Sequence, residues 1–74
     1  MINEVYNHKI NACDSVIVMD YGTCFEICIM DYNAICCRPA MIITEGVLLW
    51  EYAPTFDNAE EAIIYVRENI SNFI

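Results

Sequence analysis

The sequence contains few basic residues. Lysine and arginine together number 3, against 11 aspartates and glutamates, so the net charge is −8 at pH 7. This charge repels nucleic acids and anionic membranes, and we expect the chain to bind neither of them directly. Because few of the carboxylates can pair within the chain, their field should extend outward and steer encounter with a basic protein partner. The alternative is that the charge only keeps an apolar small protein soluble.

The residues that build common catalytic motifs are also scarce. The chain has two glycines, Gly22 and Gly46, which do not form a phosphate-binding loop. Its one histidine, His8, has no nucleophile or orienting carboxylate at a recognisable spacing, and the motifs G-x-S-x-G and H-E-x-x-H are missing. Acid–base catalysis by a carboxylate pair such as Asp20 and Asp31 is the remaining enzymatic alternative, but a shallow domain offers little room for a water-excluding pocket. The sequence predicts that the protein is not an enzyme and has no catalytic residue.

A long uncharged apolar run is missing as well. Charged residues interrupt the middle of the chain, so no transmembrane helix is expected. The first residues, Met-Ile-Asn-Glu, lack the basic and apolar segments of a secretory signal. We therefore expect a cytosolic protein, which would lie in the host cell cytosol if a phage encodes it.

The cysteines do not predict a disulfide framework or a metal site. They number 5, which is odd, and without a secretory signal we expect them to behave as small apolar residues. On a strand, the sulfurs of Cys24 and Cys28 would lie about 13 Å apart, too far to hold one ion. In an extended segment Cys36 and Cys37 point to opposite faces. The sequence predicts neither a metal nor a cofactor.

Apolar residues are abundant and make up 58% of the 74 residues. A chain this short is expected to form a single domain, residues 1–74, with a thin core, so some apolar surface should remain outside as an interface. Residues 15–31 predict a β-hairpin that turns at Tyr21-Gly22, since both arms are rich in β-branched residues. A two-residue loop would place Val18 opposite Phe25.

The two faces of this hairpin are expected to differ in what covers them. The first face is uniformly apolar and should form the core; it carries Val16, Val18, Phe25, Ile27 and Ile29. The second face has one charge, that of Glu26, and is too apolar to remain in water. We predict that it buries against another copy of the chain in a homodimer, through Ile17, Met19, Cys24, Cys28 and Met30.

The remaining elements complete an α+β fold. Residues 1–13 predict a short helix or an extended arm, and a second hairpin around Glu45-Gly46 would extend an antiparallel sheet over residues 14–52. Residues 57–73 predict a helix, with Asp57 and Glu60 as a capping box. Its apolar stripe consists of Ala59, Ala62, Ile63, Val66, Ile70 and Phe73. We expect a small two-layer domain in which a four-stranded antiparallel meander of two hairpins is covered on one face by the C-terminal helix.

Carboxylates and tyrosines are the candidate partner-binding residues. Residues 17–21 are partly repeated by residues 28–32, which we interpret as two strand ends that each run into an Asp-Tyr turn rather than as a duplicated unit. Carboxylates pair with Arg or Lys, and tyrosine is a rigid amphipathic anchor. The predicted set is Asp20, Tyr21, Asp31 and Tyr32 at the turns, and Glu61, Tyr65 and Glu68 on the helix. The alternative is that the turn tyrosines only cover strand ends.

These features favour a non-enzymatic inhibitor that occupies the basic, nucleic-acid-binding surface of a larger target. In size, acidity and lack of catalytic motifs the chain is similar to small phage-encoded inhibitors of bacterial defence, anti-CRISPR proteins among them, several of which act as nucleic-acid mimics. The similarity is one of class and involves no particular residues. The alternative function is an oligomeric adaptor or antitoxin-like module that uses the apolar sheet face.

Overall fold

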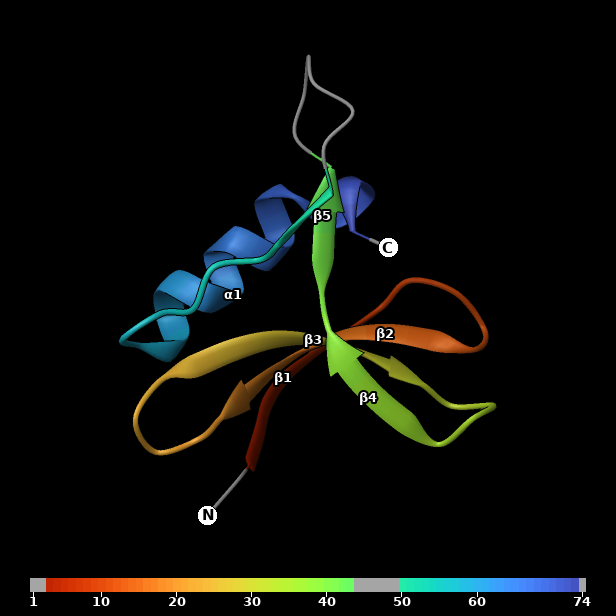
Figure 1. The fold of residues 1–74 in the computed structure, drawn as a ribbon, viewed down its shortest axis with the longest axis horizontal. Helices are drawn as coiled ribbons and strands as arrows, with labels where there is room; N and C mark the ends of the chain where they lie inside the picture. Colours follow the sequence, from red (N-terminus) through yellow and green to blue (C-terminus); the bar gives the residue numbers. More distant parts are fainter. Residues whose placement is uncertain (1–2, 44–49, 74) are drawn as a thin grey trace.

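The computed structural model describes residues 3–43 and 50–73. The elements in chain order are β1 (Asn3–Lys9), β2 (Asp14–Asp20), β3 (Phe25–Asp31), β4 (Cys36–Pro39), β5 (Met41–Ile43), β6 (Trp50–Tyr52), α1 (Ala59–Glu68) and the 3-10 helix η1 (Ile70–Asn72). Strands β1 to β4 form an antiparallel sheet in sequential order, and α1 packs on one of its faces (Figure 1). The predicted two-layer α+β fold, a four-stranded meander with one C-terminal helix, is confirmed.

The strands that make up the sheet differ from the prediction in two places. Of the two alternatives for residues 1–13, residues 3–9 follow the extended arm and not the short helix. They form β1, which joins the sheet and pairs with β2 so that Asn7 lies opposite Ile17. Asparagine side chains compete for backbone hydrogen bonds and disfavour a helix, and the pairing covers the open edge of β2. The second predicted hairpin forms a separate two-stranded sheet, in which Ile43 lies opposite Trp50. The expected turn at Glu45-Gly46 lies outside the described residues.

The central hairpin has a longer loop than predicted. Val18 lies opposite Ile27 rather than Phe25, and the N–H of Tyr21 donates to the carbonyl of Cys24 at 3.0 Å. The carboxylate of Asp20 accepts a hydrogen bond from the N–H of Gly22 at 2.8 Å, which stabilises the longer turn. The predicted register is therefore wrong by two residues.

The predicted core face survives this error. Side chains alternate along a strand with a period of two, so a shift of two residues returns each one to its expected face. Val16, Val18, Ile27 and Ile29 are between 0 and 1% exposed, and Phe25 packs against them half-buried. The hydrophobic pattern is thus a better guide to the face than to the partner of each residue.

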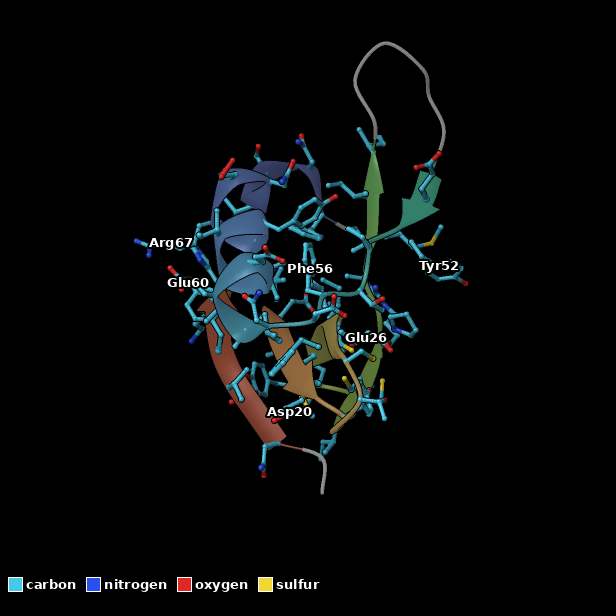
Figure 2. All side chains as sticks on the ribbon, turned by 90° about the vertical axis from the view of Figure 1, so that its left-hand side faces the viewer. Asp20, Glu26, Tyr52, Phe56, Glu60 and Arg67 are labelled. Carbon is cyan, nitrogen blue, oxygen red and sulfur yellow. The ribbon has the colours of Figure 1, made fainter. Side chains whose placement is uncertain are left out.

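The helix region is attached to the sheets by an isolated backbone bridge at each end. Before α1, the N–H and carbonyl of Phe56 exchange hydrogen bonds with Phe25 at 2.9 and 2.8 Å. After η1, Phe73 bridges to Ile42 in β5. Figure 2 shows Phe56 between α1 and the strands. These bridges hold the buried face of α1 against the core.

The boundaries of α1 are shorter than the predicted range 57–73. The N-cap is Asn58, whose side chain accepts a hydrogen bond from the N–H of Glu61 at 2.9 Å, so the cap lies one residue after the predicted Asp57. At the other end, the side chain of Asn69 donates to the carbonyl of Tyr65 at 2.9 Å, and the helix ends there. The predicted apolar stripe faces inward: Ala62, Val66 and Phe73 are buried, and Ala59, Ile63 and Ile70 are half-buried.

Ala40 links the two sheets. Figure 1 shows β4 continuing directly into β5, which leaves the plane of the four-stranded sheet. The N–H of Ala40 donates to the carbonyl of Ile27 at 3.0 Å, whereas its carbonyl accepts from the N–H of Ala53 at 2.9 Å. One strand therefore pairs first with β3 and then with β6.

Two turn residues with positive φ provide a test of backbone strain. Ile35 has φ +52° and is 86% exposed, whereas Gly22 has φ +88° and open space where a Cβ atom would lie. Left-handed backbone disfavours β-branched residues, so Ile35→Gly should raise the free energy of unfolding by roughly 1 kcal/mol, and Gly22→Ala should lower it by a similar amount. Urea denaturation measures both changes. Ala34→Gly is the matched control and should not stabilise; stabilisation of similar size there would refute strain at Ile35.

Candidate functional site

The two predicted Asp-Tyr turns use their carboxylates within the turns. Asp20 accepts from the N–H of Gly22 at 2.8 Å, and Asp31 accepts from the N–H groups of Asn33 and Ala34 at 2.9 and 3.2 Å. Strands β2 and β3 each end at these aspartates, so the interpretation of the sequence repeat as two strand ends is confirmed. Both carboxylates have a structural role here.

The same geometry separates the two aspartates that were considered as a catalytic pair. Asp20 lies opposite Phe25 at one end of the hairpin, whereas Asp31 lies opposite Asp14 at the other. Strands of this length span about 20 Å. The structure does not bring Asp20 and Asp31 together, so acid–base catalysis by this pair is not supported.

The tyrosines of both turns fold over the face of the sheet opposite α1. The hydroxyl of Tyr32 accepts from the side chain of Asn7 on β1 at 2.9 Å. Burial raises the pKa of the Tyr21 phenol, and Cys28 lies close enough for the charge of its thiol to raise it further. Cys28 and Ile17 lie opposite one another on this face and are 2 and 1% exposed. Tyr21 therefore lies beside the buried Cys28, whereas Tyr32, which is 46% exposed, contacts the edge strand β1.

This burial weakens the reason for expecting self-association. The face was expected to be open apolar surface, yet Ile17 and Cys28 are buried within the chain, and Met19, Cys24 and Met30 are half-buried. Buried side chains have little remaining apolar area to offer a second copy. Homodimer formation stays a prediction, and its contact residues would reduce to the three half-buried side chains.

Cys28 is the centre of a polar cluster on this face. Its sulfur donates to a carboxylate oxygen of Glu26 at 3.6 Å. Burial, followed by the negative charges of Cys37 and Glu26, raises the pKa of Cys28 to about 12. Burial and the charges of Cys28 and Glu26 likewise raise the pKa of Tyr21 to about 12. Both groups stay protonated at neutral pH.

A groove between the β5–β6 sheet and the C-terminal end of α1 is the best candidate for a binding site. Its volume is about 670 Å³. The lining residues come from β5, β6, α1 and the segments that follow them: Ile42, Ile43, Glu51, Tyr52, Pro54, Tyr65, Glu68, Asn69 and Asn72. Two apolar side chains lie at its β5 wall, and two carboxylates, two amides, two phenols and Pro54 line the rest. We call it the acidic groove.

The acidic groove is suited to positively charged groups. Glu51 on β6 and Glu68 on α1 line it, and its nine lining residues include no Lys, Arg or His. Burial and the negative charge of Glu51 raise the pKa of Tyr65, so this carboxylate lies close enough to act on the phenol. The C-terminal end of a helix also carries partial negative charge. A guanidinium or ammonium group would find carboxylates and a tyrosine ring together.

Tyr52 extends the candidate surface beyond the acidic groove. It is 70% exposed and projects away from α1 (Figure 2). It also lines two smaller hollows of about 270 and 310 Å³, both of which include Pro39. A rigid, exposed aromatic side chain with hollows beside it is typical of a protein contact.

Sequence reasoning identified part of this site. Of the seven predicted partner-binding residues, Tyr65 and Glu68 line the acidic groove, whereas Glu61 is exposed near the start of α1. Four lining residues with polar side chains were missed: Glu51, Tyr52, Asn69 and Asn72. For Asn69, the tendency of asparagine to cap a helix end was a signal that the sequence offered. Glu51 and Tyr52 could not be found in this way, because the position of β6 beside α1 depends on tertiary packing.

Comparisons with known proteins do not add to this site. No protein-family model, curated protein or solved structure matches the chain. In the described part of the chain, no three side chains of His, Cys, Asp or Glu converge in a way that could hold a metal ion. Within residues 3–43 and 50–73, no helix combines the length and apolar composition that crossing a bilayer requires.

The polar cluster predicts a loss of stability at alkaline pH. The pKa of Cys28 is about 12 in the folded protein, against an ordinary value of 9.0. Since the unfolded chain loses this proton first, the contribution of Cys28 to the free energy of unfolding should be constant below pH 9 and fall above it. The slope for one proton is at most about 1.4 kcal/mol per pH unit. Urea denaturation under reducing conditions, on either side of pH 9, measures it.

The control for this prediction removes the thiol. Cys28→Ala should be less stable overall because it leaves a small cavity, but its stability should decline less steeply between pH 9 and 10. Cys36→Ala, at an exposed position, should retain the wild-type slope. Equal slopes in all three proteins would show that Cys28 does not cause the decline.

Proposed function

We propose that the protein is a non-enzymatic inhibitor that occupies a basic, nucleic-acid-binding surface of a larger protein. The observation that carries the proposal is the acidic groove, where Glu51 and Glu68 from separate elements line one concavity whose described lining residues include no Lys, Arg or His. A groove of this chemistry binds an Arg or Lys side chain of the kind that otherwise contacts nucleic-acid phosphates. Cytosolic action on such a partner is part of the proposal.

The remaining charge supports the same partner chemistry. Glu60 and Glu61 lie in the exposed first turn of α1, and Figure 2 shows Glu60 on the outer side of the helix. With a net charge of −8, the molecule has a long-range field that accelerates encounter with a positive surface. Long-range attraction of this kind sets the rate of encounter, whereas the groove would set the orientation of the complex.

Tyr52 would supply the apolar contact of the complex. Its ring is 70% exposed beside the acidic groove, and interface energy is concentrated in such aromatic anchors. In such a complex a partner side chain would lie in the acidic groove while another part of the partner surface packs against Tyr52. The alternative function, an adaptor that works through the apolar sheet face, has less support because Ile17 and Cys28 are buried.

The first test is capture of the partner at low and high salt. Tagged protein is incubated with host lysate, and the bound proteins are identified by mass spectrometry. We expect a basic nucleic-acid-binding protein whose capture is lost at high salt and is displaced by added polynucleotide, because both compete for the same charges. A partner that resists both treatments would contradict nucleic-acid mimicry and favour the adaptor function.

Charge reversal then separates the acidic groove from net charge. Against the purified partner, Glu51→Lys with Glu68→Lys should weaken binding about tenfold or more, since two carboxylates of the contact are replaced by like charges. Glu60→Lys with Glu61→Lys changes the net charge equally and should weaken binding only a few-fold, mainly through the association rate. Circular dichroism checks that both variants fold. Equal losses would refute the groove as the contact.

A further inference from the structure

The face opposite α1 contains two cysteines on neighbouring strands. Cys28 on β3 lies opposite Pro39, and Cys37 on β4 lies opposite Met30. Residues opposite one another share a face, so Cys28 and Cys37 lie on the same face as diagonal neighbours. The sequence spacing of the cysteines does not reveal this pair, because it depends on the register of β3 with β4.

The two thiols are neighbours but differ in exposure. Burial raises the pKa of Cys28, and Cys37 lies close enough for its negative charge to raise it further. Cys28 is 2% exposed and donates to Glu26 at 3.6 Å, whereas Cys37 is exposed. An oxidant in solution can therefore reach Cys37. The buried thiol of Cys28 is the neighbouring group that can react with the oxidised Cys37. This arrangement is that of an accessible cysteine beside a resolving cysteine.

We propose that Cys37 and Cys28 form a reversible thiol–disulfide pair that reacts with a peroxide. Cys37 loses its proton and its sulfur attacks one peroxide oxygen, the O–O bond breaks, and the departing hydroxide takes up that proton and leaves as water, which gives a sulfenic acid on Cys37. The sulfur of Cys28 then attacks the Cys37 sulfur and displaces the hydroxyl group. The Cys28 proton joins the departing hydroxide as a second water, and Glu26, which accepts the S–H hydrogen bond, is placed to transfer it.

The electron balance of the pair is complete. Both thiols are oxidised to one disulfide, and one peroxide is reduced to two waters. A dithiol reductant reverses the bond by thiol–disulfide exchange.

Strand β4 can make the adjustment that the bond requires. Diagonal neighbours on antiparallel strands lie about 7–8 Å apart, and a disulfide needs the two Cα atoms within about 7 Å. Strand β4 is at the edge of the sheet, and all four of its residues are exposed. A small approach of this edge strand toward β3 is sufficient. The bond would tie β4 to β3 beneath Tyr21.

The test treats the reduced, folded protein with hydrogen peroxide at a low molar ratio and maps the cysteines by mass spectrometry without reduction. We expect a linked peptide pair that contains Cys28 and Cys37, lacks two hydrogen atoms and is restored by a dithiol reductant. Cys36→Ser, at the neighbouring exposed position, should leave the yield unchanged. Links that involve Cys13, Cys24 or Cys36 in equal or greater yield would overturn the proposal.

Two further variants separate chemistry from folding. Cys37→Ser changes an exposed residue, should fold normally and should leave Cys28 in the thiol form after peroxide treatment. Cys28→Ser should leave Cys37 as a sulfenic acid that dimedone traps, if the variant folds. Two outcomes would refute the pair. One is oxidation of Cys28 in the folded Cys37→Ser variant, and the other is conversion of Cys37 to sulfinic acid in the wild type without formation of the disulfide. This inference is independent of the proposed inhibitory function.

Discussion

The backbone hydrogen bonds of Ala40 are the constraint on which the rest of the structure depends. One residue donates to Ile27 in the four-stranded sheet and accepts from Ala53 beside β6. The chain must therefore leave β3 at this point and continue as β5, which in turn bridges to Phe73 after the helix. This exchange places β5 and β6 beside the C-terminal end of α1, so the acidic groove is a consequence of one strand that changes partners.

The division of roles among the acidic residues follows from what their local backbone requires. Asp20 and Asp31 lie where strands end, and turn N–H groups there need acceptors, so both carboxylates are used in the fold. Glu51 and Glu68 lie in β6 and α1, their side chains make no hydrogen bond to a turn within the described residues, and they line the acidic groove. A carboxylate is thus available to a partner where no turn uses it as an acceptor.

The central hairpin shows what the local pattern of apolar residues can predict and what it cannot. Alternating apolar residues assigned Val16, Val18 and Ile27 to the core face, although the predicted loop was too short by two residues. The loop length depends on Asp20 and on the bridge from Phe25 to Phe56, which joins residues far apart in the chain. The cap at the start of α1 was predicted one residue too early for a local reason, because neighbouring Asp57 and Asn58 are both competent N-caps.

Side-chain period and composition were enough to determine the fold class, the faces of the strands, the inward stripe of the helix and the net charge. Tertiary packing was needed to establish that residues 3–9 join the sheet, that Ile17 and Cys28 are buried, and that Cys28 and Cys37 are diagonal neighbours on one face. It also established which carboxylates share a groove. The physical reason is range: alternation and capping act within a few residues, whereas strand register and packing join segments that only the folded chain brings together.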